Sequence, residues 1–130
     1  MAIIKTTRLA NGGDRNLIIQ QAQQTAAGDI AYIIYPSAGV SRYGVGASAV
    51  QFSVDTATNV KISFSLCGLD AINNYLADQS LPAPAGIQEP AFVLADTLTA
   101  DTFKEYQFPY TVMKAEFTGG GKALLTVAVA

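Results

Sequence analysis

Apolar residues occupy every second position in two neighbouring segments, 50–54 and 60–66, with polar residues between them. This alternation is typical of β-strands that bury one face and expose the other. The intervening segment Asp55–Asn59 is rich in residues that favour turns. We therefore predict that the two segments pair as a β-hairpin, with one face in the core and a small, polar face outside.

A second alternation covers 113–117 and 123–129, on either side of the connection Thr118–Lys122. The consecutive glycines of this connection can adopt the positive φ angles that tight hairpin turns need. We predict a second hairpin here, so that the chain would end inside a sheet.

Further segments have the composition of strands and are bounded by glycine, proline, asparagine or aspartate. Ile30–Tyr35 is apolar at every position, which predicts a strand covered on both faces. Pro109 lacks the N–H group of a ladder, so it confines the strand before it to an edge or to that strand's own end. These segments are Ala2–Leu9, Leu17–Gln24, Ile30–Tyr35, Phe92–Leu94 and Thr102–Phe108, and Gln20–Gln24 has a short helix as its alternative.

One short helix is predicted where Leu69, Ile72 and Leu76 recur at helical spacing. The prolines of Leu81–Pro90 favour an extended connector over the surface. The glycines of Pro36–Ser48 favour a long exposed loop.

These elements predict a mainly β fold: an antiparallel β-sandwich for which a jelly-roll strand order is one option, with at most one short helix near 69–77. The chain has 130 residues, the size of one domain, so we assign residues 1–130 to a single sandwich. Residues 1–9 are either its first strand or an N-terminal arm that adds a strand to a partner's sheet.

The composition excludes most familiar catalytic mechanisms. The chain has no histidine and one cysteine, which rules out Ser-His-Asp catalysis, Cys-His catalysis and imidazole metal sites. Only 14% of residues are charged and the net charge is -2, with no basic run, which argues against nucleic acid as a partner. No apolar window reaches the length of a membrane span, and the N-terminus lacks the features of a secretory signal. We expect a protein made in the cytoplasm, with no membrane partner.

Few of the remaining residues are candidates for a catalytic or ligand-binding site. Gly44–Ala49 matches a dinucleotide-binding pattern, but it leads into a strand where that pattern requires a helix. Asp96 with Asp101, or Asp101 with Glu105, could form a glycosidase-like pair, although their positions fit turn residues better. Cys67 ends an apolar alternation and is expected to be a buried thiol. We predict no catalytic, cofactor-binding or metal-binding residue, and a protein that is not an enzyme.

The aromatic stretch 103–110 places Tyr106, Phe108 and Tyr110 on one face of a strand. That face is either half of a sandwich core, or an edge that packs on another subunit or lines a sugar groove. The low charge leaves too many apolar faces for a monomer, so we predict a homo-oligomer, with a trimer preferred. The candidate interface residues are Ile3, Ile4, Tyr32, Ile34, Tyr43, Tyr106, Phe108 and Tyr110.

The glycine-rich closing hairpin, the low charge and the small Ala, Thr and Ser residues of the strands resemble small structural proteins of tailed bacteriophages. Head decoration (cement) proteins are the class that the chain resembles most, above all over Tyr110–Ala130. The resemblance implies a β-sandwich that trimerises on the capsid surface of the virion, after synthesis in the host cytoplasm. It also implies that this trimer stabilises the head by binding the major capsid protein.

Two other functions stay open at this point. One is a carbohydrate-binding module of a phage fibre or bacterial enzyme, with Tyr43, Tyr106 and Tyr110 as stacking surfaces. The other is a phage neck or tail component that completes a ring. Both are functions of a binding protein without an active site.

Overall fold

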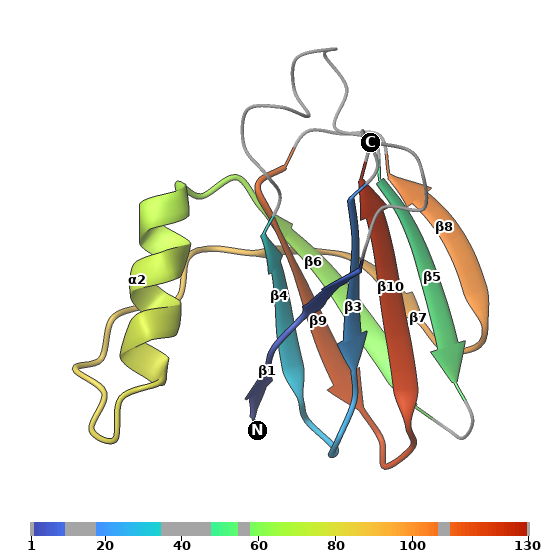
Figure 1. Ribbon diagram of the computed structural model, residues 1–130, viewed down its shortest axis with the longest axis horizontal. Helices are drawn as coiled ribbons and strands as arrows, with labels where there is room; N and C mark the ends of the chain where they lie inside the picture. The colour runs from blue at the N-terminus through green and yellow to red at the C-terminus, as the bar shows by residue number, and fades with distance from the viewer. Residues whose placement is uncertain (1, 10–17, 35–47, 55–57, 107–109, 130) are drawn as a thin grey trace.

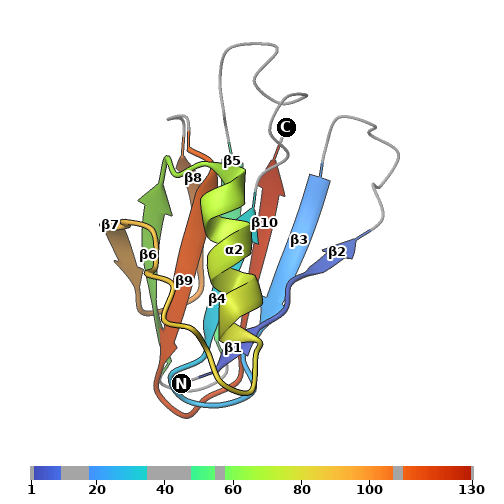
Figure 2. The same cartoon turned by 90° about the vertical axis from the view of Figure 1, so that its left-hand side faces the viewer.

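The computed structural model describes residues 2–9, 18–34, 48–54, 58–106 and 110–129, and these residues form two facing β-sheets with one helix beside them (Figures 1 and 2). Sheet A consists, in spatial order, of β1 (Ile3–Ile4), β4 (Ile30–Ile34), β9 (Val112–Thr118), β6 (Asn59–Ser65) and β7 (Val93–Leu98). Sheet B consists of β2 (Thr7–Leu9), β3 (Ile18–Gln23), β10 (Ala123–Val129), β5 (Ser48–Val54) and β8 (Thr102–Tyr106). The prediction of a mainly β sandwich is confirmed.

The strand order is that of a jelly roll. From β3 to β10 the chain passes repeatedly from one sheet to the other. Among the described strands, the pairs that are both consecutive in sequence and hydrogen-bonded are β2 with β3 and β6 with β7. All pairings are antiparallel except that of β1 with β4, which is parallel. β8 lies at the edge of sheet B, which is one of the two positions that Pro109 allows for the strand before it.

Both predicted hairpins are wrong in their pairing, although the strands and their buried faces are correct. β5 lies in sheet B and β6 in sheet A, and likewise β9 lies in sheet A and β10 in sheet B. Alternation shows that one face of a strand is apolar, but it does not show which strand lies beside it in the sheet, because a facing sheet covers that apolar face whether or not the two strands pair. The two connections are therefore corners between sheets, and β10 lies in the middle of sheet B.

The main core fills the space between the sheets. Its largest fully buried side chains include Phe52, Ile62, Phe117 and Leu125, which come from both sheets. Burying side chains of this size from two inner faces is the main source of stability in a sandwich.

A second core cluster lies between sheet A and helix α2 (Leu69–Gln79). Ile72 of the helix is fully buried and packs with Ile30, Tyr32 and Val112. Ala31 and Ile33 of the same strand face the main core, so β4 is covered on both faces, as its uniformly apolar sequence predicts. Figures 1 and 2 show α2 standing outside the two layers, on the β4 side.

The N-terminal segment pairs with strands of its own chain. Ile3 and Ile4 lie beside β4, and the chain then crosses to sheet B, where Thr7–Leu9 pairs with β3. This arrangement corresponds to the first-strand alternative for residues 1–9.

The β3–β4 corner is held by a buried carboxylate. Oδ2 of Asp29 accepts hydrogen bonds from Thr25 N, Thr25 Oγ1 and Ala26 N, each at 2.8 Å. Burial alone would raise the pKa of this carboxyl group, but the hydrogen bonds from Thr25 and Ala26 outweigh it and lower the pKa below its ordinary value. The charged form of Asp29 therefore stabilises the fold.

We expect Asp29→Asn to reduce the loss of unfolding free energy that the protein shows at acidic pH. Because the pKa of Asp29 is lowered in the folded state, its contribution is present above about pH 4 and is lost as the pH falls through the folded value. Chemical denaturation at about pH 7 and about pH 3 should show a smaller loss of unfolding free energy in Asp29→Asn than in the wild type. The exposed control Glu105→Gln should keep the wild-type loss, and an equal loss in Asp29→Asn would contradict the assignment.

The core also gives a matched pair of substitutions. Phe117 is fully buried between the sheets, whereas Phe103 is 68% exposed. Phe117→Ala should lower the free energy of unfolding by about 3–5 kcal/mol, and Phe103→Ala should change it by less than about 0.5 kcal/mol. Equal effects of the two substitutions in thermal or urea denaturation would contradict the assignment of the inner and outer faces.

Candidate functional site

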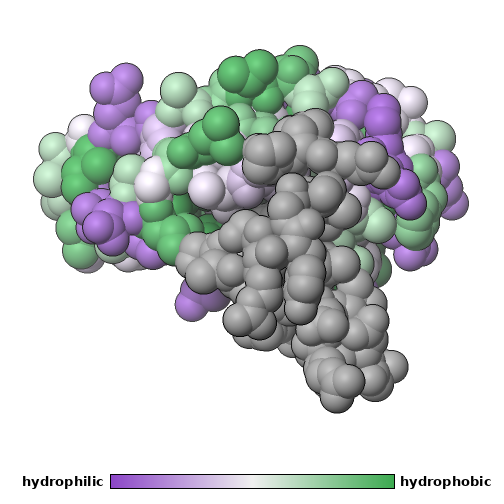
Figure 3. Space-filling model, turned by 90° about the horizontal axis from the view of Figure 1, so that it is seen from above, coloured by the Kyte–Doolittle hydropathy of each residue, from purple (hydrophilic) through white to green (hydrophobic). Residues whose placement is uncertain are grey.

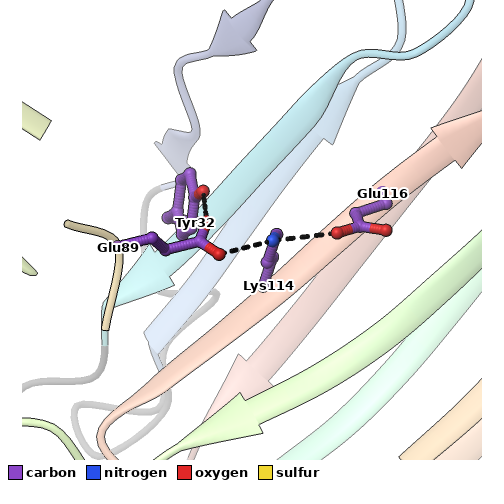
Figure 4. Close-up of polar contacts among 4 residues, drawn as sticks. All are labelled: Tyr32, Glu89, Lys114 and Glu116. Carbon is purple, nitrogen blue, oxygen red and sulfur yellow. Dashed lines mark hydrogen bonds and ion pairs between the residues drawn. The ribbon is translucent and has the colours of Figure 1, made fainter. Parts of the chain in front are cut away.

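A cluster of connected polar side chains lies on the outer face of sheet A, beneath the connector that follows α2 (Figure 4). The ammonium group of Lys114, on β9, lies 2.9 Å from Glu89 Oε1 and 2.9 Å from Glu116 Oε1. The hydroxyl of Tyr32 donates a hydrogen bond to Glu89 Oε2. The Lys114 side chain is 11% exposed, so this cation is mostly enclosed by its partners.

The electrostatics of the cluster keep both of its proton donors protonated. Burial alone would lower the pKa of Lys114, but its hydrogen bonds to Glu116 and Glu89 outweigh burial and raise it. Burial and the hydrogen bond to Glu89 both raise the pKa of Tyr32. Neither group is available as a base or nucleophile near neutral pH. The cluster therefore acts as a clamp that ties the connector to sheet A.

Aromatic rings complete the clamp. The Lys114 ammonium lies 5.5 Å from the centroid of the Phe92 ring and 5.9 Å from that of Tyr32. The Tyr32 ring also meets Tyr75 of the helix edge-on, at 6.0 Å between centroids. Helix, connector and sheet are thus joined at one point.

Substituting the clamp lysine should destabilise the protein. Lys114→Met removes the cation that separates two partly buried carboxylates, so we expect the free energy of unfolding to fall by about 1–3 kcal/mol. Lys61→Met, at an exposed position of the same sheet, is the matched control and should be near neutral. Denaturation curves in which both variants equal the wild type would contradict the clamp.

A half-open groove of about 630 Å³ lies beside the clamp, between the N-terminal segment and α2. It brings together half of the sequence-predicted interface residues: Ile3, Ile4, Tyr32 and Ile34. Sequence reasoning missed its helical wall, which includes Leu76 and Gln79, because nothing in the sequence shows which strand the helix covers. The lining residues are Ala2, Ile3, Ile4, Lys5, Thr6, Tyr32, Ile34, Leu76, Gln79 and Ser80.

Two of the tyrosines predicted to form a binding surface, Tyr106 and Tyr110, are buried. Tyr106 and Tyr110 are 5% and 8% exposed, and their rings pack on Phe64 with centroids 4.9 Å and 4.1 Å away. This matches the sandwich-core alternative, and it corrects the assignment of these two rings to an interface or a sugar-stacking surface. Tyr43 and Phe108 lie outside the described residues.

The carboxylates considered as a catalytic pair have separate structural partners. Asp96 accepts hydrogen bonds at 2.8 Å from Lys104 Nζ and from the Tyr106 hydroxyl. The hydrogen bond from Lys104, helped by that from Tyr106, lowers the pKa of Asp96 despite its burial. Asp101 Oδ1 accepts a hydrogen bond from the Val54 amide at 2.8 Å. Asp96 links the edge strands β7 and β8, and Asp101 caps a backbone group, as its turn position suggests.

The edge strand β7 carries an exposed apolar patch. Leu66 and Val93 are 74% exposed and Leu94 is 56% exposed. Val93 and Leu94 lie opposite Phe64 and Ser63 on β6, and Leu66 follows that strand closely. On its other side, β7 pairs with no strand of the described chain. We call Leu66, Val93 and Leu94 the β7 edge patch.

The remaining surface and the cysteine give no further candidate for a catalytic or metal-binding site among the described residues. Viewed from above, the surface mixes hydrophilic and hydrophobic residues (Figure 3). The described residues contain no group of three or more Cys, Asp or Glu side chains placed to hold a metal ion. Cys67 is half-buried beside the second core cluster. Among the described residues, no helix is long and apolar enough to cross a membrane.

Comparison with known proteins finds no matching protein family and no matching curated protein. Among solved structures, hydroquinone 1,2-dioxygenase from Sphingomonas sp. TTNP3 is 12% identical with a TM-score of 0.45, over 95% of this chain and 65% of that one. Recombinant oxalate oxidase in complex with glycolate is 14% identical with a TM-score of 0.48, over 95% of this chain and 49% of that one. A mutant of the carbohydrate-binding module CBM29-2 is 13% identical with a TM-score of 0.44, over 96% of this chain and 76% of that one. Likenesses at this level assign no function.

Proposed function

We propose that this protein is a non-enzymatic structural protein whose subunits associate with each other and with a larger assembly. The observation that carries the proposal is the β7 edge patch. Leu66, Val93 and Leu94 place three largely exposed apolar side chains along one open sheet edge, with Val93 and Leu94 on opposite faces of that edge. Soluble monomers usually protect such an edge with charge, proline or a covering segment.

The distribution of charge on the edge strands also supports association through β7. The only charged residue of β7 is Asp96, and Lys104 holds it in an ion pair at 2.8 Å. The strand edge therefore offers a partner apolar side chains and backbone groups without an unpaired charge to desolvate. β8, at the edge of the other sheet, has a single largely exposed apolar residue, Phe103, which is followed by Lys104 and the exposed Glu105.

The specific form of the proposal is a decoration protein of a tailed-phage head, acting as a trimer that binds the major capsid protein on the capsid surface. It rests on the sequence resemblance over Tyr110–Ala130. The low charge fits this role, because neutral faces are buried in an assembly at a lower desolvation cost than charged ones. Such a protein works by adhesion and needs no catalytic residue.

A charge placed on the β7 edge patch should dissociate the oligomer. We expect sedimentation velocity to show a concentration-dependent oligomer for the wild type and a monomer for Val93→Lys, because the new ammonium group would have to be buried at the contact. Leu81→Lys, at a 51% exposed position after the helix, is the control and should sediment like the wild type.

Two outcomes would contradict the proposal. One is a wild-type protein that stays monomeric up to about 100 μM, a concentration at which even weak association is visible. The other is an oligomer that Val93→Lys leaves intact, which would place the contact on another surface.

A further inference from the structure

The outer face of sheet B carries a straight row of neutral polar side chains. On the central strand β10, Thr126 lies opposite Gln21 of β3 on one side and Gln51 of β5 on the other. Gln51 in turn lies opposite Phe103 of β8. We call Gln21, Thr126, Gln51 and Phe103 the polar row, which crosses four strands and so extends about 14 Å. Sheet B forms the front layer in Figure 1.

The polar row has the functional groups needed to bind neutral hydroxyl compounds. Gln51 is exposed, and its amide can donate and accept hydrogen bonds at once. The Gln21 amide donates to Thr126 Oγ1 at 3.2 Å, which fixes the orientation of both side chains. Phe103 ends the row with a ring that is 68% exposed and can pack on an apolar ligand face.

The surface around the polar row is hollowed. One hollow of about 310 Å³ lies between Gln51, Ser53 and Phe103, and a second of about 690 Å³ lies along Gln23, Ser53 and Leu124. Ser53 lines both, so the two hollows adjoin. Their charged lining residues are Asp101 in the first and Lys122 in the second, and none belongs to the polar row.

We infer that the polar row is a binding site for a neutral oligosaccharide. Amide and hydroxyl groups exchange hydrogen bonds with sugar hydroxyls, and the C–H face of a sugar ring packs on Phe103. An acidic sugar would have to give up solvation of its charge at a row that contains no cation. The aromatic residue of this site is Phe103 and not Tyr106 or Tyr110, the stacking residues expected from the sequence. Strand alternation turns Phe103 outward and Tyr106 into the core.

An array of neutral and sialylated oligosaccharides, probed with the labelled full chain, tests this inference. We expect retention on neutral glycans, and titration calorimetry with the best-retained one should then compare variants. Phe103→Ala and Gln51→Ala should each weaken binding by roughly tenfold, which corresponds to about 1.4 kcal/mol. Phe103→Tyr keeps the ring and should retain binding, and Gln79→Ala, an exposed glutamine on α2, should bind like the wild type.

The inference is overturned if no neutral glycan is retained, if only sialylated glycans are, or if Phe103→Ala and Gln51→Ala bind like the wild type. The changed side chains are exposed, so equal melting temperatures will show that any loss of binding is not a loss of folding. Repeating the titration with Val93→Lys separates sugar binding from self-association.

Discussion

The two sheets bury their inner apolar faces against each other, and the remaining structure follows from this constraint. Because the chain changes sheets at most connections, neighbouring strands in sequence contribute to opposite layers of the core. Phe52 and Phe117, far apart in sequence and in different sheets, lie in the same cluster. In sheet A, β9 lies between β4 and β6, and in sheet B, β10 lies between β3 and β5. The first half of the chain therefore cannot form a continuous sheet without the second half, and we expect the sandwich to form as one cooperative unit.

The sequence predicts most of the strands, although it ends one at Leu94 and expects a turn at Asp96 where β7 continues to Leu98. It does not predict how the strands pair. Alternation shows that a strand has one apolar face, but it carries no information on which strand pairs with that strand's edge. For this reason 50–54 and 60–66 were predicted correctly as strands and wrongly as partners. Helix α2 was predictable from Leu69, Ile72 and Leu76 at helical spacing, but its place on the β4 side was not.

Surface residues were harder to identify than core residues. In 103–110, alternation alone leaves open which face of the strand is buried, and the structure buries Tyr106 and exposes Phe103. The β7 edge patch had no signal in the sequence, because Val93 and Leu94 look like core residues until the edge position of β7 is known. The low fraction of charge did point to association, and the patch gives that expectation a specific location.

The central claim is that the β7 edge is covered when subunits associate, and amide hydrogen exchange tests it most directly. Exchange at Val93–Leu98 should be measured in dilute and concentrated protein, with the central strand β10 as the internal reference. The account predicts that protection of β7 rises with concentration while that of β10 stays constant. Exchange of β7 that is fast and independent of concentration would contradict it.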